Sequence, residues 1–521
     1  MEKERILKLI KKPKNSLLRI VFSRLVIVFL MLALQIFLYI AFFVLISQFL
    51  PYFAVFQSVF TFIMMLYLFN NKMDSSAKLT WLALIAVLPI FGAFLLAFTQ
   101  RNLGHRNMQR NMDRIIKNTK KMLPQDVKVT DALSGDLYCT NDLQRYMNLS
   151  GAYPICDGTL VNYYPLGEDA FPVMLEELEK AEKFIFLEYF IIEEGYMWGR
   201  ILDILSRKAA EGIDVRVLYD GTCEFSKLPS HYPELLSGFG IKARMFAPIK
   251  PFLSSHYNYR DHRKIMVIDG KTAFSGGINL ADEYINHTHP YGQWKDTGVM
   301  LKGKAVSSFT LMFLQLWELP NPYPEFDIAL LETDEYSDTE GYVMPFGECP
   351  LTENKLGEAV YMDILNRARK NVHIMTPYLI LDDELKCALK YAAQRGVDVK
   401  LILPGIPDHK TAHALARSHY GELIDAGIGI YEYTPGMVHA KVCVSDECRA
   451  VVGTINLDYR SLYHHFECAA YLYKVPCIGD IERDFQQTLA VCRKITRAEL
   501  KSERKLYNLA GALLKVIAPL M

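Results

Sequence analysis

The 521-residue sequence has no net charge, because 58 lysines and arginines balance 58 aspartates and glutamates. A protein that binds nucleic acid usually carries a clear excess of positive charge, so we expect no nucleic-acid partner. The sequence also lacks a disulfide scaffold, since its ten cysteines are spread along the chain without a C-x-x-C pair. We therefore expect most cysteines to be reduced and to pack in domains that face the cytoplasm.

Charge is also absent from three hydrophobic runs near the N-terminus, at residues 25–46, 52–69 and 79–98. Runs of this length match a helix that crosses the hydrocarbon core of a bilayer, and the first is too long for a cleaved signal peptide. Buried core helices are the alternative interpretation. Three uncharged runs so close together instead favour a transmembrane helical anchor over residues 25–98.

Basic segments flank this anchor on both sides. Residues 1–24 carry eight lysines and arginines against two glutamates, and residues 99–121 form a second basic segment. The positive-inside rule places both flanks in the cytoplasm, which three full crossings cannot achieve. Either one run is re-entrant or interfacial, or one flank lies on the other side, and we favour residues 25–46 as the irregular element. We expect a multi-pass protein of the cell membrane whose soluble part faces the cytoplasm and whose basic flanks attract anionic phospholipids.

The rest of the chain contains an internal repeat of strands and helices. Buried-strand and amphipathic-helix patterns alternate in the same order twice. They cover residues 183–192, 199–212 and 213–221, then residues 371–380, 383–396 and 397–405. "GIDVRVLYDG" in the first set matches "GVDVKLILPG" in the second almost residue by residue. This repeat predicts two homologous α/β halves around a pseudo-two-fold axis, at residues 122–335 and 340–521, joined by the acidic segment 330–343.

The spacing H-x-K-x4-D occurs once in each half, in "DHRKIMVIDG" and in "VHAKVCVSDE". A glycine and an asparagine follow each histidine at equal offsets of 14 and 17 residues. One copy of such a string arises by chance, but two copies in register indicate a shared role. The residues concerned are His262, Lys264, Asp269, Gly276 and Asn279 in the first half, and His439, Lys441, Asp446, Gly453 and Asn456 in the second.

Both strings continue with the alternation of a strand, so the histidine and the lysine share one face and the aspartate has the opposite parity. A pseudo-two-fold axis would bring the two pairs into one site. There, one imidazole can attack phosphorus and the other can act as general acid and base. The lysines, helped by Asn279 and Asn456, would neutralise the phosphate oxygens. No metal or other cofactor is required. Metal ligation by both histidines is the competing interpretation, which the nearby lysines oppose.

These motifs resemble the phospholipase D superfamily, and the chain is similar to the bacterial cardiolipin synthase family over roughly residues 60–521. The resemblance rests on "NYRDHRKIMVIDGKTAFSGGINLADEYI" and "PGMVHAKVCVSDECRAVVGTINLDYRSLYHHFE". It implies two phospholipase D-like α/β halves behind a membrane anchor. It also implies transfer of a phosphatidyl group between two phosphatidylglycerol molecules through a phosphatidyl-histidine.

The resemblance also implies a role for each site residue. His262 would be the nucleophile and His439 the general acid and base, although the symmetry of the motifs permits the reverse. Asp296 and Glu467 would orient the imidazoles. Asp269 and Asp446 belong to the catalytic motif, and we expect them to have a structural role.

Three other functions remain possible for this sequence. A hydrolase or another phosphatidyltransferase would use a different acceptor, and phosphatidylethanolamine could replace one phosphatidylglycerol as donor. A nuclease would need a basic groove, and a non-catalytic scaffold would have lost a histidine or lysine of the motifs. The C-terminal residues 504–521 have apolar side chains at helical spacing and could lie on the membrane or dock on their own domain.

Overall fold

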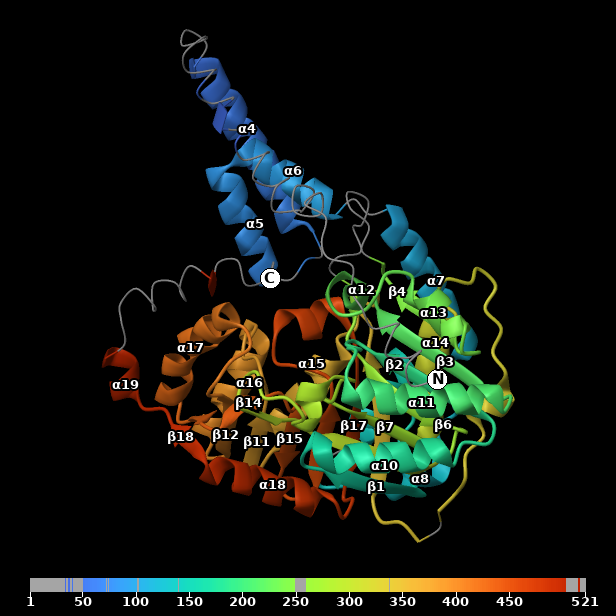
Figure 1. Cartoon of the computed structure of the whole chain (residues 1–521). Coiled ribbons are helices and arrows are strands. Elements are labelled where there is room, and N and C mark those ends of the chain that lie inside the picture. The colour runs from blue at the N-terminus through green and yellow to red at the C-terminus, as the bar shows by residue number, and fades with distance from the viewer. Residues whose placement is uncertain are drawn as a thin grey trace.

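The computed structural model describes residues 50–71, 73, 75–100, 103–138, 140–248, 259–336 and 338–502, together with residues 33, 36, 37, 40, 514 and 515. Among the described residues, the six helices α4 to α9 come before the first strand, and a long series of strands and helices follows (Figure 1). The first elements are α4 (Leu50–Phe69), α5 (Ser75–Val87), α6 (Pro89–Gln100), α7 (Leu103–Thr119), α8 (Val127–Ala132) and α9 (Thr140–Gly151).

The first half of the repeat contains the next elements along the chain. They are β1 (Thr159–Tyr164), α10 (Gly167–Glu179), β2 (Phe184–Tyr189), α11 (Tyr196–Ala210), β3 (Asp214–Asp220), α12 (Thr222–Ser226), α13 (Tyr232–Ser237), β4 (Lys242–Phe246), β5 (Arg260–Asp261), β6 (Lys264–Ile268), β7 (Thr272–Gly276), the 3-10 helix Asp282–Ile285, β8 (Gln293–Lys295), β9 (Gly298–Gly303), α14 (Val306–Trp317) and the 3-10 helix Ile328–Leu331.

The second half contains the remaining elements. They are β10 (Tyr342–Glu348), α15 (Leu356–Arg367), β11 (Asn371–Met375), α16 (Asp383–Gln394), β12 (Asp398–Pro404), α17 (Lys410–Asp425), β13 (Gly429–Tyr433), β14 (Gly436–Val438), β15 (Val442–Ser445), β16 (Arg449–Gly453), the π-helical turn Arg460–His464, β17 (His465–Tyr473), α18 (Ile478–Ala490), β18 (Cys492–Lys494) and α19 (Arg497–Ser502).

The sheets of the two halves share one order over seven strands, to which the second sheet adds β18, and this confirms the predicted repeat. The first sheet runs β1-β9-β7-β6-β2-β3-β4, and the second runs β10-β17-β16-β15-β11-β12-β13-β18. In both, the strand after the motif histidine pairs antiparallel with both neighbours: β6 lies between β7 and β2, and β15 lies between β16 and β11. In Figure 1 the first half, in green, lies to the right of the second half, in orange and red.

A shared apolar core joins the halves. All twelve residues of α14 are buried, and most of them are apolar. Phe309 and Phe313 of α14 belong to the same buried cluster as Val442 and Val452 of the second sheet and Phe485 of α18. The sheets are therefore held against one core, and the histidine motifs of both halves lie beside it.

The helix α7 docks the basic segment 99–121 onto this core. Met112 and Ile115 on its apolar stripe are buried in the shared cluster. Gln315 of α14 donates a hydrogen bond to the Thr119 hydroxyl at 2.8 Å, and Asn111 donates to the carbonyl of Leu319 at 3.3 Å. These contacts attach α7 to the shared core.

The hydrophobic runs correspond to α4, α5 and α6 where they are described. Residues 79–98 form two helices rather than one, because Pro89 has no N–H to continue α5 and instead begins α6. Gly92 allows α5 and α6 to pack closely, since a Cβ at this position would lie 2.9 Å from Ile85 Cγ1. Residues 25–46 lie outside the described residues except at four positions. Within the described part of the chain, no helix combines the length and the apolar character needed to cross a membrane.

The C-terminal segment 504–521 lies outside the described residues except at Leu514 and Lys515. Leu514 packs against the buried residues Ile380, Leu415 and Tyr459. Lys515 donates a hydrogen bond to the carbonyl of Ser418 at 3.0 Å. At these two positions the segment therefore contacts its own domain.

Candidate active site

Each motif histidine lies in a short segment that crosses to the other half. His262 follows β5, which pairs in parallel with the start of β17, and its N–H donates to the Phe466 carbonyl at 2.9 Å. His439 follows β14, which pairs in parallel with β8, and its N–H donates to the Lys295 carbonyl at 2.8 Å. The sequence predicted both histidines inside the strands, but β6 begins only at Lys264 and β15 only at Val442. Each histidine backbone is thus fixed by the opposite half.

The imidazoles are held by carboxylates in the same crossed arrangement. His262 Nδ1 lies 2.8 Å from Glu467 Oε2, although Glu467 belongs to the second half. His439 Nδ1 lies 2.6 Å from Asp296 Oδ2, although Asp296 belongs to the first half. In both cases, the residue whose carbonyl accepts the histidine N–H is followed directly in the sequence by the residue whose carboxylate holds the imidazole. Each motif histidine is therefore paired with a carboxylate of the opposite half.

Burial and hydrogen bonding set the protonation of the two pairs. Burial would raise the pKa of Glu467, but the contact with His262 outweighs it, and the pKa of this carboxyl lies well below its usual range. Burial also lowers the pKa of His262 to about 3, more strongly than Glu467 raises it. The ionised carboxylate can only accept, so Nδ1 donates and the lone pair of Nε2 is free for chemistry. The pKa of His439 is lowered as well, by burial and then by the charge of Lys441.

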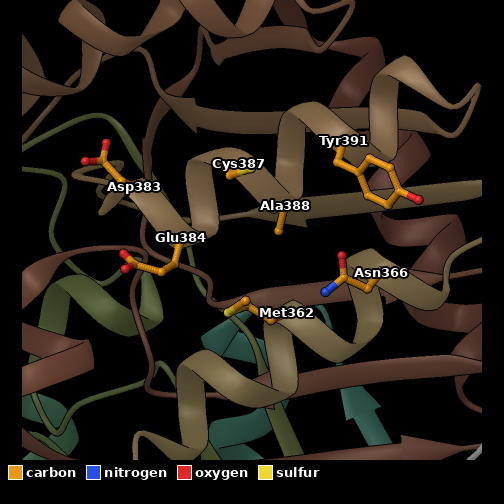
Figure 2. A pocket seen from close by; sticks show the side chains of 7 residues that line it. All are labelled: Met362, Asn366, Asp383, Glu384, Cys387, Ala388 and Tyr391. Atoms are coloured by element: carbon orange, nitrogen blue, oxygen red, sulfur yellow. The ribbon is translucent and has the colours of Figure 1, made fainter.

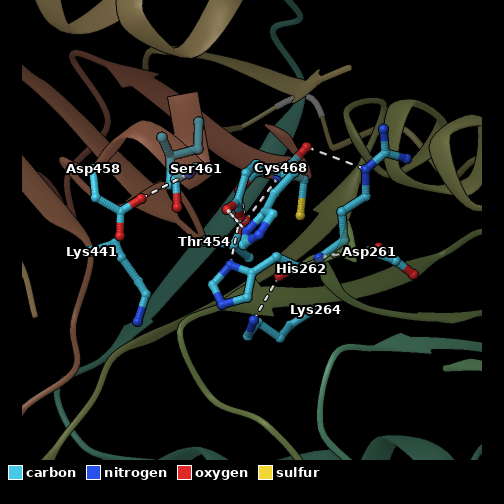
Figure 3. A network of polar contacts seen from close by, with 12 residues as sticks. Asp261, His262, Lys264, Lys441, Thr454, Asp458, Ser461 and Cys468 are labelled. Atoms are coloured by element: carbon cyan, nitrogen blue, oxygen red, sulfur yellow. Dashed lines mark hydrogen bonds and ion pairs between the residues drawn. The ribbon is translucent and has the colours of Figure 1, made fainter. Parts of the chain in front are cut away.

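The two motif lysines bring positive charge to the same place. Lys264 Nζ donates to the carbonyl of His262 at 2.6 Å, and Lys441 Nζ lies 2.8 Å from His439 Nδ1. Burial lowers the pKa of Lys264 to about 8. The pKa of Lys441 falls to about 7, because burial and the charge of Lys264 outweigh the attraction of Asp296. Figure 3 shows His262 and Lys264 of the first half close to Lys441 of the second.

The motif aspartates are placed at the far ends of the strands. The Asp269 carboxylate accepts three backbone N–H groups at 2.7–2.8 Å, from Glu182, Lys183 and Phe184 at the start of β2. Asp446 does the same for Arg369, Lys370 and Asn371 at the start of β11. Both aspartates have φ near 54°, a left-handed conformation that aspartate tolerates better than most residues. These contacts fix the register of each hairpin against its neighbouring strand.

The Asp269→Ala variant is expected to lower the free energy of unfolding by about 3 kcal/mol, because it loses three hydrogen bonds to a carboxylate. Denaturant unfolding of the purified protein in micelles, followed by tryptophan fluorescence, measures the change. Asp269→Asn keeps a hydrogen-bond acceptor and is the matched control, with a smaller loss. Equal stability of the alanine variant and the unmodified protein would contradict this structural role.

The motif asparagines differ in their contacts. Asn279 accepts a hydrogen bond from the Ile191 N–H at 3.0 Å and donates to the Tyr284 hydroxyl at 2.8 Å, so both ends of its amide contact protein groups. Asn456 is 4% exposed, and within the described residues its Oδ1 accepts no hydrogen bond. Asn279 thus positions the loop beside His439, and the phosphate-binding role expected for both asparagines stays a prediction.

Aromatic rings that the sequence interpretation missed enclose the two imidazoles. The ring of Phe190 lies 4.8 Å from that of His262, and the rings of Tyr284 and Trp294 each lie 5.3 Å from that of His439. His465 lies 5.5 Å from His262 by the same measure. Trp294 and His465 each precede the orienting carboxylate by two residues, and residues two apart on a strand share a face. This two-residue spacing could have identified both residues from the sequence.

The two carboxylates are supported in different ways. The Thr454 hydroxyl donates a hydrogen bond to Glu467 Oε2 and accepts one from the Cys468 N–H at 3.0 Å. Gly277 occupies the matching position in the first half, where a Cβ would lie 1.9 Å from Asp296 Oδ1. Any side chain at residue 277 would therefore displace Asp296. The difference between "GGIN" and "GTIN" thus follows from the carboxylate that each residue faces.

Two groups of side chains in the described part of the chain have the spacing to hold a metal ion. One consists of His262, His465 and Glu467, and the other of Glu358, Asp382 and Glu384. Glu384 also borders a surface hollow of about 410 Å³ between α15 and α16 (Figure 2). The hollow is lined by Met362, Asn366, Asp383, Glu384, Cys387, Ala388 and Tyr391. It contains no residue of the histidine motifs.

Comparisons with known proteins agree with this geometry. A family model described as "Cardiolipin synthase, PLD-like domain" matches residues 174–317 and 361–489. A Streptococcus mutans protein described as uncharacterized is 51% identical over 88% of this chain and 99% of its own length. A cardiolipin synthase of Alkalihalophilus pseudofirmus is 31% identical over 90% of this chain and 93% of its own. The cardiolipin synthase 2 of Bacillus cereus is 32% identical, over 87% and 88%.

A solved structure also shares the fold. The crystal structure of a phosphatidylserine synthase from Haemophilus influenzae covers 73% of this chain and 97% of its own, with a TM-score of 0.57 and 16% identity. At this identity the likeness shows the fold alone. It supports the two-half α/β architecture derived from the strand order.

Proposed function

Because this chain belongs to the cardiolipin synthase family of phospholipase D-like phosphatidyltransferases, we propose that it transfers a phosphatidyl group from one phosphatidylglycerol molecule to another, giving cardiolipin and glycerol. The observation that carries the proposal is the crossed pair of imidazoles, each held by a carboxylate of the opposite half and accompanied by a lysine. Such a site offers a nucleophile, a general acid and base, and two cations at one place.

In the first step, His262 Nε2 attacks the phosphorus of phosphatidylglycerol. A P–N bond forms, the bond to the headgroup oxygen breaks, and glycerol leaves with a proton from His439. His262 suits this role, because burial keeps it unprotonated while Glu467 holds the ring through Nδ1. The negative phosphodiester favours the protonated form of His439 when substrate is bound.

In the second step, a free hydroxyl of another phosphatidylglycerol attacks the phosphatidyl-histidine. His439 removes the proton of this hydroxyl, the new P–O bond forms, and the P–N bond to His262 breaks. The two lysines balance the charge of the phosphate oxygens in both steps. Preorganised donors of this kind contribute about 3–4 kcal/mol each in enzymes that stabilise an oxyanion.

We further propose that the enzyme acts at the cell membrane, with its catalytic halves on the cytoplasmic side. The uncharged runs and their basic flanks support this placement. The surface of α4 supports it too, since Val55, Val59, Phe62 and Phe69 are each more than half exposed. An exposed apolar strip of this kind is expected to contact lipid. The docked helix α7 would then hold the active site close to its lipid substrates.

The value of kcat/KM is expected to fall as pH rises through about 7 to 8, the pKa values of Lys441 and Lys264. Below these values both lysines are cationic and can hold the phosphodiester, and above them the charge is lost. Assays from about pH 5 to pH 10 measure the profile. Lys441→Arg is the informative variant, because its guanidinium stays charged and should move the fall to higher pH. A profile that stays flat across this range would contradict the role of the lysines.

A lipid product assay tests the reaction itself. The purified full-length protein is incubated with phosphatidylglycerol vesicles without nucleotide or metal, and the products are measured by mass spectrometry. Cardiolipin and glycerol in equal amounts are expected. Phosphatidic acid alone would mean that water is the acceptor, and the proposal would be wrong. Vesicles that also contain phosphatidylethanolamine show whether this lipid can replace one phosphatidylglycerol.

A further inference from the structure

His465 is a buried residue beside the active site that the transfer reaction does not use. It begins β17 and is 7% exposed. Its ring centroid lies 5.5 Å from that of His262, and its Nδ1 lies 3.6 Å from Glu467 Oε1. Within the described residues, neither ring nitrogen of His465 makes a hydrogen bond, and neither does Glu467 Oε1. Three polar atoms of these two side chains are thus buried without a hydrogen bond, which is rare in proteins.

The pseudo-symmetry of the two halves is broken at this position. His465 lies two residues before Glu467, and Trp294 lies two residues before Asp296. The tryptophan covers His439 with an indole, which can donate a hydrogen bond but offers no lone pair to a metal. The histidine covers His262 with a second imidazole, which can bind a metal. Only the His262 side of the active site therefore gains a ligating group.

The donor atoms of this cluster are close enough to share one ion. One ligand atom from each of His262, His465 and Glu467 lies within 4.8 Å of the other two. Two imidazoles and a carboxylate with a fourth position open form a common zinc site, whereas magnesium and calcium prefer oxygen ligands. We propose that His262, His465 and Glu467 bind a transition-metal ion such as Zn²⁺, and that this ion inhibits the enzyme by binding the nucleophilic histidine and breaking its contact with Glu467.

The charges around the cluster fit a reversible inhibitor better than a permanent structural metal. Zinc binds neutral imidazoles and an ionised carboxylate, so the ligands supply one negative charge. Lys264 donates to the backbone carbonyl of His262 at 2.6 Å, and its positive charge opposes a cation nearby. Bound through Nδ1 of His262, the ion would replace the hydrogen bond to Glu467 that orients this imidazole for attack. Metal binding and phosphatidyl transfer therefore exclude each other.

Cobalt binding tests the site without relying on activity. The full-length protein in micelles is titrated with Co²⁺, followed by its visible absorption, and Zn²⁺ is then added in competition. We expect one equivalent to give a four-coordinate spectrum, with affinity reduced at least about tenfold in His465→Gln, as for other groups at metal sites. His289→Gln, at an exposed histidine, is the matched control and should bind like the unmodified protein. Equal binding by His465→Gln would overturn the proposal.

X-ray absorption of the unmodified protein with one equivalent of Zn²⁺ gives a test that needs no variant. The proposal predicts two imidazoles in the shell, with Zn–N distances of about 2.0–2.1 Å. A shell with one imidazole or none would refute it, even if His465→Gln fails to fold. Inhibition of cardiolipin formation by Zn²⁺, reversed by a chelator and weaker in His465→Gln relative to its own zinc-free rate, would extend the result to activity. Because the spectra do not depend on turnover, they separate this proposal from the transfer reaction.

Discussion

The His262→Ala variant is expected to form cardiolipin at least about 10⁴-fold more slowly than the unmodified enzyme, because it removes the atom that attacks phosphorus. His439→Ala should be similarly slow in turnover but should differ in what accumulates. Without His439, the phosphatidyl-histidine at His262 forms slowly and then lacks the base that activates the acceptor. Mass spectrometry of the acid-sensitive adduct on the intact protein distinguishes the two variants.

His289→Ala, at an exposed histidine away from both motifs, controls for the loss of an imidazole and should keep normal turnover. An adduct in His439→Ala, and none in His262→Ala, assigns the nucleophile to His262. The reverse pattern would exchange the roles of the two histidines. Near-normal turnover in either single variant would refute a site shared by both halves.

The second large effect is expected at Glu467, which lies in the second half but holds the nucleophile of the first. Glu467→Gln should slow turnover by about 10² to 10⁴-fold, since an amide cannot fix the imidazole tautomer as a carboxylate does. In the His439→Ala background, only the first step, formation of the phosphatidyl-histidine adduct, can be followed. The crossed geometry can therefore be tested more sharply in this variant. There, Glu467→Gln should slow adduct formation further.

Asp296→Asn is the matched control for this effect, because Asp296 orients only His439. In the His439→Ala background it should leave the rate of adduct formation almost unchanged, while in the unmodified enzyme it should slow turnover. The effect of each carboxylate variant on turnover should also be non-additive with the effect of replacing the histidine that this carboxylate holds. Coupling of Glu467 to His439, and of Asp296 to His262, would contradict the crossed pairing.

The repeated halves could be predicted from the sequence because their signals are local. Alternating strands and amphipathic helices occur twice in the same order, and the matching sheets follow from them. The break in residues 79–98 was also visible in the sequence, because Pro89 cannot continue a helix. The prediction of one helix there gave more weight to the uncharged run than to the proline.

The crossed pairing could not be predicted, because it depends on contacts between distant segments. The strands that carry it, β5 with β17 and β8 with β14, pair over only two or three residues. Segments this short have no periodicity that a sequence pattern could detect. The sequence did identify Asp296 and Glu467 as orienting residues by family resemblance. Only the structure shows that each one serves the histidine of the opposite half.

The stereochemical course at phosphorus tests the central claim most directly. A phosphatidylglycerol donor whose transferred phosphorus is chiral through oxygen isotopes is converted to cardiolipin by the unmodified enzyme, and the configuration of the product is determined. Two successive in-line displacements, through His262 and then through the acceptor hydroxyl, predict overall retention. Inversion would mean one direct displacement by the acceptor, and the covalent phosphatidyl-histidine account would be wrong.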